Sequence, residues 1–246
     1  MIFKKFKNLD KKINIKKKDV ILFHINLASI KEHYNNTKVE EINYFLFFLL
    51  KSFFSSKGTF LIPSFSYNFC KGMKFDKKKT KSDTGQFSNF LISKYPKNRS
   101  SNPIFSILSF GYKSKEFINS STSTCFGKNS FFEKLIVNNG KICFFGTSFN
   151  KLTFIHYLEE KYQVNYRKNK KFTGIANNKE IKVNYYVRDL NSKKNFNFNK
   201  LKNDLIKKNK VSKTKIGRFE YLSVRCKDID LEFKKNYKKN MNYYLR

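Results

Sequence analysis

The sequence has no tryptophan, three prolines and four cysteines in 246 residues. The cysteines show neither the CxxC spacing of a zinc site nor the crowding of a secreted disulfide scaffold: Cys70, Cys125, Cys143 and Cys226. Cys143 lies in a short apolar run, which favours a buried, reduced thiol. A small secreted fold held by disulfides is therefore not expected.

Long apolar segments are also missing. The longest apolar run, Tyr44 to Leu50, is far shorter than the roughly 20 residues that span a bilayer. No apolar segment follows the first lysines, so no signal peptide is expected. These features predict a soluble, cytoplasmic protein without a membrane span.

Acidic residues and arginine are scarce. The chain has 18 Asp and Glu against 52 Lys and Arg, which gives a formal charge of +34, and only six of the 52 are arginine. The abundant residues, Lys, Asn, Ile and Phe, are those of A/T-rich codons, so much of this charge reflects a genomic background. Arginine is preferred for bidentate contacts to phosphates and bases, so nucleic-acid binding is not favoured. The charge would still attract anionic ligands such as coenzyme A or nucleotide-linked sugars.

What the sequence does contain is a series of short, continuous apolar runs that alternate with amphipathic segments. These runs have the pattern of strands buried on both faces: 20–23, 59–63, 107–110 and 142–146. Thr37 and Glu40 form a capping-box signature, which predicts that a helix begins there, and residues 130–137 have helical spacing. The alternation predicts an α/β sandwich whose sheet is covered on both faces.

The chain shows no internal repeat and no linker, so we expect one domain at residues 19–246, preceded by a lysine-rich leader at residues 1–18. The leader carries apolar residues at helical spacing, which favours a docked terminal helix over a membrane-surface helix: Phe3, Phe6, Leu9, Ile13 and Ile15. The late part of the chain is more polar. It contains strand-like runs at 181–187 and 221–224, a lysine-dense excursion near 190–210 and an amphipathic segment at 228–244.

Histidine is well suited to acid–base chemistry near neutral pH, because its unperturbed pKa is about 6.5. The sequence has three: His24, His33 and His156. His156 follows a buried strand that ends at Gly146, on a helix that begins near Thr153. Glu159 and Glu160 lie one helical turn further on, where a carboxylate can bind one ring nitrogen and leave the other as a base. The same spacing also suits a surface histidine beside solvated glutamates.

Other chemistry lacks support in the sequence. His24 ends the first strand, where it either lines a site or binds a loop carbonyl, and His33 lies in a polar loop. The chain has no HExxH, Walker, GxGxxG or nucleophile-elbow motif. Zinc, nucleoside triphosphate, dinucleotide and serine-hydrolase chemistry are therefore not predicted, and no metal is expected.

In their order, these segments resemble the aminoglycoside N(3)-acetyltransferase family. The resemblance covers about residues 18–235 and rests on successive motifs: His24 to Ser29, Gly58 to Tyr67, Asp83 to Gly85, Arg99 to Ser106, Gly127 to Ser130, Gly140 to Gly146, the Thr-x-x-His-x-x-Glu motif of Thr153, His156 and Glu159, and Gly217 to Asp228. No single motif is diagnostic, but their order and spacing together are specific.

This resemblance implies a three-layer αβα sandwich around a central, mostly buried sheet. It implies transfer of an acetyl or similar acyl group from coenzyme A to a primary amine of an amino sugar, with His156 as the base and Glu159 as its partner. The residues implied to hold acetyl-CoA are His24, Asn26, Leu27, Ala28, Ser29 and Ser106, and those implied to hold the amino sugar are Ser64, Phe65, Tyr67, Asp83 and Asn102. The oligomeric state stays open, with a homodimer as one option.

Two departures from the family pattern bear on the substrate. Asn102 replaces a histidine, and Asn89 stands where the family usually has glutamate. Asparagine forms hydrogen bonds but neither exchanges protons nor carries charge, so a polycationic antibiotic is disfavoured and an amino sugar on an anionic carrier is preferred. Two alternatives remain: a catalytically silent member that acts as a binding or scaffold protein, and a basic nucleic-acid-binding protein that shares the fold.

Overall fold

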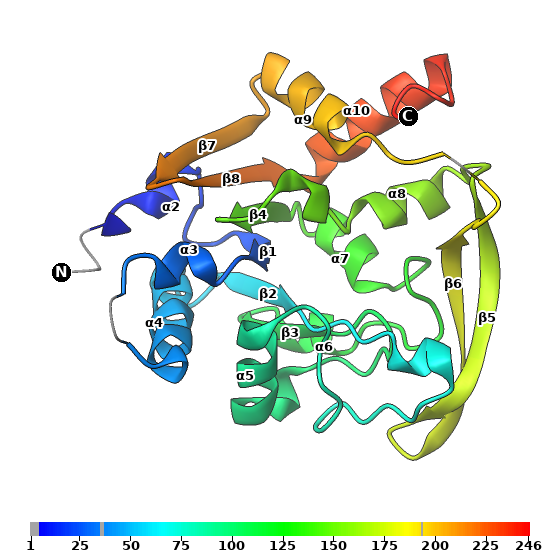
Figure 1. The fold of residues 1–246 in the computed structure, drawn as a ribbon, viewed down its shortest axis with the longest axis horizontal. Helices are drawn as coiled ribbons and strands as arrows, with labels where there is room; N and C mark the ends of the chain where they lie inside the picture. Colours follow the sequence, from blue (N-terminus) through cyan, green and yellow to red (C-terminus); the bar gives the residue numbers. More distant parts are fainter. Residues whose placement is uncertain (1–4, 35–36, 193) are drawn as a thin grey trace.

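The computed structural model describes residues 5–34, 37–192 and 194–246, so Phe3 of the leader lies outside the described residues. A six-stranded sheet with the order β3-β2-β1-β4-β8-β7 forms its centre (Figure 1). Its strands are β1 (Val20–Ile25), β2 (Thr59–Pro63), β3 (Ile107–Gly111), β4 (Lys141–Phe145), β7 (Val211–Ile216) and β8 (Phe219–Arg225). β1 runs parallel to β2 and β4, while the β2–β3, β4–β8 and β7–β8 pairs are antiparallel.

The four apolar runs predicted as buried strands are confirmed as β1 to β4. In register, Leu22 of β1 pairs with Leu61 of β2 and with Ile142 of β4. Side chains alternate between the two faces of a strand, so Leu22 enters one hydrophobic cluster and its neighbour Ile21 enters the other. Both faces of the sheet are covered, which is why these strands lack a polar side.

One face of the sheet is covered by α2 (Leu9–Lys12), α3 (Ala28–Lys31), α4 (Val39–Ser52) and α5 (Gln86–Lys94) (Figure 1). The apolar residues described in the leader are buried on this face: Phe6, Leu9, Ile13 and Ile15. The capping-box prediction was off by one position, because α4 begins at Val39 and Lys38, not Thr37, occupies its N-cap position.

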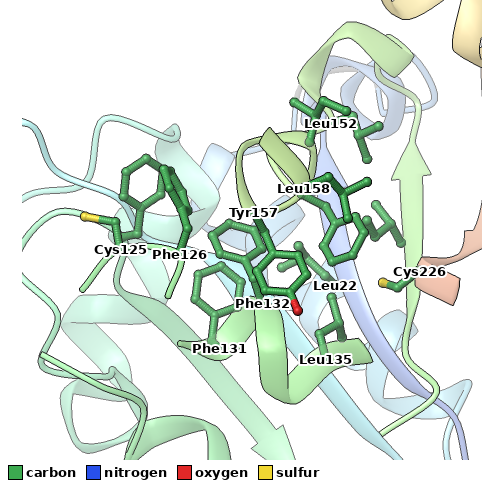
Figure 2. Packing of buried hydrophobic residues seen from close by; sticks show 14 of the residues in the cluster. Leu22, Cys125, Phe126, Phe131, Phe132, Leu135, Leu152, Tyr157, Leu158 and Cys226 are labelled. Atoms are coloured by element: carbon green, nitrogen blue, oxygen red, sulfur yellow. The ribbon is translucent and has the colours of Figure 1, made fainter. Parts of the chain in front are cut away.

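The opposite face is covered by α7 (Phe131–Val137), α8 (Ile155–Lys161), α9 (Phe198–Lys207) and α10 (Cys226–Lys239). Figure 2 shows α7 and α8 packing around Leu22 through the side chains of Phe131, Phe132, Leu135, Tyr157 and Leu158. The helix predicted at 130–137 is confirmed: the Ser130 hydroxyl accepts a hydrogen bond from the backbone N–H of Glu133. The predicted three-layer αβα sandwich is thereby confirmed.

Short connections carry α6 (Ser114–Ile118) and the 3₁₀ turns η1 (Asn68–Lys71), η2 (Pro96–Asn98) and η3 (Phe149–Lys151). All four cysteines are free thiols. Among the described helices, none combines the length and apolar character needed to cross a membrane.

A separate hairpin of β5 (Arg167–Ala176) and β6 (Lys179–Arg188) stands beside the central sheet (Figure 1). Two isolated bridges, Phe75–Ala176 and Thr124–Asn184, attach it to loops of the sandwich. The strand predicted at 181–187 is confirmed as β6, whereas β5 was not predicted. The lysine-dense stretch contains α9, whose Leu201 and Leu205 are fully buried.

Candidate functional site

A cavity of about 480 Å³ opens beside the carboxyl ends of β1 and β2. The carboxyl ends of parallel strands are where open α/β sheets form ligand sites. Six residues predicted for the site line it together: His24, Asn26, Leu27, Phe65, Tyr67 and Asp83. Further polar lining residues had not been assigned to the site, although two of them belong to the motifs of the resemblance, Thr84 and Thr153; the others are Gln86, Ser88, Thr147 and Lys151.

His24 is neutral in this cavity. Its ring stacks on Phe144 with 5.4 Å between the centroids, and its Nε2 lies 3.4 Å from the hydroxyl of Thr153. Burial, reinforced by the positive charge of Lys151, lowers its pKa from 6.5 to about 3. His24 therefore offers a hydrogen-bonding ring without positive charge throughout the physiological pH range.

Most backbone N–H groups of the loop after β1 donate hydrogen bonds to other atoms of the chain. The N–H of Asn26 donates to Phe145 (3.1 Å), that of Ala28 to the side-chain oxygen of Asn26 (3.1 Å) and that of Ser29 to the backbone oxygen of Asn26 (3.0 Å). Ala28 and Ser29 lie outside the cavity lining. Within the described part of the chain, only the N–H of Leu27 in this loop remains without a hydrogen bond.

Ser64 and Ser106 belong to a buried network behind the cavity. Their hydroxyl oxygens are 3.1 Å apart, and the Ser106 hydroxyl donates to the carbonyl of Ser64 at 2.6 Å. The fully buried guanidinium of Arg99 donates to the Ser106 hydroxyl (3.0 Å) and to the carbonyls of Ser64 (2.7 Å) and Thr80 (2.5 Å). Arg99 thus joins Ser64, in the loop after β2, to Thr80 and Ser106 further along the chain. Neither Ser64 nor Ser106 is among the residues that line the cavity.

Asp83 lines the cavity at the point where two loops meet. Its carboxylate accepts from the backbone N–H of Tyr67 at 2.8 Å, and its own N–H donates to the carbonyl of Phe65 at 2.8 Å. Asn89 holds the other side of this loop, since its side chain accepts from the N–H of Ser82 at 2.7 Å and donates to the Ser82 carbonyl at 3.0 Å. Asn89 therefore acts as a loop clamp.

Asn102 lies outside the cavity lining and is buried. Its amide group donates to the carbonyls of Ser121 (3.1 Å) and Thr124 (2.9 Å). Its side-chain oxygen accepts from the N–H groups of Ile104 (3.1 Å) and Phe105 (2.8 Å). All of these partners belong to the chain itself, so the amide joins two loops.

His156 and Glu159 form the pair that their spacing predicted. Nδ1 of His156 lies 2.7 Å from Oε2 of Glu159, one turn further along α8. The carboxylate is only 1% exposed, whereas the imidazole is about 25% exposed. His156 is not part of the cavity lining. Thr153 does line the cavity, and its backbone carbonyl accepts a hydrogen bond from the backbone N–H of His156 at 3.1 Å. The ring packs on Phe126, with 5.7 Å between the centroids.

Two residues that the sequence did not single out complete this cluster. The hydroxyl of Tyr166 donates to Oε1 of Glu159 at 3.0 Å. Nε of Arg167, at the start of β5, lies 2.6 Å from Oε2 of Glu159, and its Nη2 lies 2.8 Å from Nδ1 of His156. The one available signal was that Arg167 is among only six arginines of the chain.

Burial lowers the pKa of His156 below its usual 6.5, and the charge of Arg167 lowers it further. The carboxylate of Glu159 acts in the opposite direction, both by its hydrogen bond and by its charge. The ring is therefore neutral at neutral pH. Among the residues that the structure describes, no group of three or more His, Cys, Asp or Glu side chains could hold a metal ion.

The sequence profile of a family described as aminoglycoside 3-N-acetyltransferase matches residues 22–236. The chain belongs to this family. The match spans both the cavity and the His156 cluster of this aminoglycoside 3-N-acetyltransferase family member. A search of curated protein sequences finds no match.

Solved structures share the fold at low sequence identity. The YokD protein from Bacillus subtilis is 19% identical, with 94% of this chain and 91% of that chain covered and a TM-score of 0.75. The aminoglycoside acetyltransferase AAC(3)-IVa is 17% identical, with 99% and 90% covered and a TM-score of 0.76. AAC-IIIb, in a binary complex with CoASH, is 15% identical, with 97% of both chains covered and a TM-score of 0.77. At these identities the likeness establishes the fold alone.

Proposed function

We propose that this protein transfers an acetyl or similar acyl group from a coenzyme A thioester to a primary amine of an amino sugar, with His156 as the general base. The observation that carries the proposal is the 2.7 Å contact between Nδ1 of His156 and the buried carboxylate of Glu159. A carboxylate only accepts hydrogen bonds, so in the tautomer that donates from Nδ1 to Glu159 the ring nitrogen Nε2 is free to accept a proton. Membership of the acetyltransferase family, and a related structure bound to CoASH, support the same chemistry.

The reaction needs a base because an ammonium group has no lone pair. The amine nitrogen attacks the thioester carbonyl, a C–N bond forms, and the proton passes to Nε2 of His156. The C–S bond then breaks, and the coenzyme A thiolate leaves and takes up a proton. We assign the free N–H of Leu27 to the thioester oxygen, since a fixed backbone donor stabilises charge that develops there.

We further propose that the acceptor is an amino sugar on an anionic carrier, such as a nucleotide-linked intermediate. Asp83 is the one carboxylate among the described lining residues, and its side chain already binds the N–H of Tyr67. A protein of charge +34 also repels a polycation at long range. Two related structures of AAC(3)-IVa contain a gentamicin and apramycin, so aminoglycosides are the acceptors to test against.

Release of free thiol from acetyl-CoA tests the proposal, with a nucleotide-linked amino sugar and an aminoglycoside as parallel acceptors. His156→Ala is expected to lower turnover by about 10²- to 10⁴-fold, the usual contribution of a general base. His33→Ala is the matched control, because His33 contacts Lys5 and the ring of Phe6, on the face of the sheet opposite α8. Full activity in His156→Ala would refute the role of His156, and turnover of aminoglycosides alone would refute the anionic acceptor. Saturable binding of coenzyme A without turnover would instead identify a silent binding protein.

A further inference from the structure

The carboxylate of Glu159 contacts both the guanidinium of Arg167 and the imidazole of His156. Its Oε2 lies 2.7 Å from Nδ1 of His156 and 2.6 Å from Nε of Arg167. The Arg167 contact is an ion pair without hydrogen-bond geometry at Nε. A single carboxylate of charge −1 therefore faces a permanent guanidinium and an imidazole that would become a second cation on protonation.

We propose that Arg167 is a positioning residue that keeps His156 neutral by pairing with Glu159 and standing beside Nδ1. The proposal rests on the role of His156 as the base given above. Without Arg167, a protonated His156 would form an ion pair with Glu159, and such a pair favours the charged imidazolium. With Arg167 present, the carboxylate is already neutralised, and protonation would leave two cations 2.8 Å apart.

The environment of Arg167 fixes its position. Its side chain is about 10% exposed, and Nη1 donates to the carbonyl of Tyr186 on the neighbouring strand at 3.0 Å. Tyr166 holds the other carboxylate oxygen of Glu159 at 3.0 Å. The guanidinium is thus held at the imidazole by the hairpin, and it has little solvent to screen its charge.

The groups that face His156 come from three elements. Glu159 belongs to the same helix, Arg167 comes from β5, and the ring of Phe126 comes from the segment before α7 and carries no charge. Burial and Arg167 both lower the pKa of His156, which agrees with the geometry, while Glu159 opposes them.

The two contacts at Nδ1 also exclude one another as hydrogen bonds. Nδ1 donates to Glu159 only when it carries a proton, and it accepts from Arg167 only when it does not. Only the first state leaves Nε2 as the base. The pairing of Arg167 with Glu159 holds the carboxylate in place for that state, because Oε2 can accept a hydrogen bond from the protonated Nδ1 while it stays close to the guanidinium.

Nitrogen-15 NMR titration of the ring nitrogens tests the proposal directly, because the chain has only three histidines. In the unmodified protein His156 is expected to titrate below pH 6.5. In Arg167→Gln its pKa is expected to rise by about one unit or more, the usual effect of a nearby charge, and Arg167→Lys should fall between the two. Arg188→Gln is the matched control, since Arg188 pairs with Arg167 across the hairpin but donates to the carbonyl of Ser192.

The acid limb of the pH profile of kcat/KM is expected to move upward with the NMR pKa in Arg167→Gln and to stay in place in Arg188→Gln. An unchanged His156 pKa in folded Arg167→Gln would overturn the proposal. If Arg167→Gln does not fold, a pKa of His156 above 6.5 in the unmodified protein would overturn the proposal instead. Because NMR needs no substrate, a shifted pKa without any turnover would contradict the proposed function and leave the role of Arg167 intact.

Discussion

Gly146 and Ser29 are in contact across the carboxyl ends of β4 and β1: a Cβ atom on Gly146 would lie 2.1 Å from the Cβ of Ser29. Gly146 also has a φ of +65°, in the left-handed region that side chains disfavour. The Ser29 hydroxyl cannot easily turn away, because it donates to the carbonyl of Asn26 at 2.7 Å. The absence of a side chain at Gly146 therefore lets the first loop approach the sheet and line the cavity.

Gly146→Ala is expected to lower the free energy of unfolding by about 2–5 kcal/mol, from backbone strain together with overpacking. Gly72→Ala is the control: Gly72 has a φ of +79°, but a Cβ there would meet nothing within 4 Å. It should cost only about 1–2 kcal/mol. Denaturant unfolding of both variants measures the difference, and equal losses would contradict the contact with Ser29.

Glu159→Gln removes the charge of the buried carboxylate and keeps its shape. Arg167, about 10% exposed, would then lose its ion-pair partner. Breaking a buried pair in this way is expected to cost about 3 kcal/mol of unfolding free energy, and activity should fall as well. Glu160→Gln, at the next position of α8, is expected to change stability by less than about 1 kcal/mol, since Glu160 forms no ion pair with any described residue. Urea unfolding of the two variants compares them, and a Glu159→Gln protein as stable as Glu160→Gln would argue against the ion pair.

The stability of the protein should depend on the titration of His24. Its pKa is about 3 when folded and about 6.5 when unfolded, so between these values the unfolded chain binds more protons. Stability from neutral His24 is then fully present above pH 6.5 and is lost as the pH falls toward 3, by at most about 1.4 kcal/mol per pH unit. In His24→Gln, the free energy of unfolding is expected to decrease by about 2 kcal/mol less between pH 6.5 and pH 4.5 than it does in the unmodified protein.

Unfolding free energies measured across this pH range test the prediction. His33→Gln serves as the comparison: the pKa of His33 is also lowered, by burial and then by Lys5, but its ring lies outside the cavity and is only partly buried. A smaller difference from the unmodified protein is expected there. Parallel curves for His24→Gln and the unmodified protein would contradict a buried, neutral His24.

The sequence predicted the central strands better than the peripheral ones, for a physical reason. β1 to β4 are covered on both faces, so each is a continuous apolar run, as in Ile142 to Phe145. β5 is mostly exposed and rich in lysine, and β7 is an edge strand without a fully buried residue. Neither strand has the apolar pattern that identifies a buried strand.

The candidate site divides in the same way. The pairing of His156 with Glu159 depends on helical spacing alone, so it could be predicted from sequence. The contact of Arg167 with His156 and Glu159 depends on how the β5–β6 hairpin packs against α8, and no local sequence pattern predicts that packing. The resemblance to a family motif assigned Asn102 to the amino-sugar site, while the structure shows its amide bound on all sides by loop backbone.

The hairpin that carries Arg167 is joined to the sandwich by two isolated bridges and by buried Ala176, Val183 and Tyr186, and it contributes no residue to the cavity lining among the described residues. Under the proposed role of Arg167, the pKa of His156 and the lining of the cavity are therefore set by different stretches of the chain. Exchange of this hairpin with that of a relative would then alter the surroundings of His156 and leave the cavity-lining residues of this chain in place.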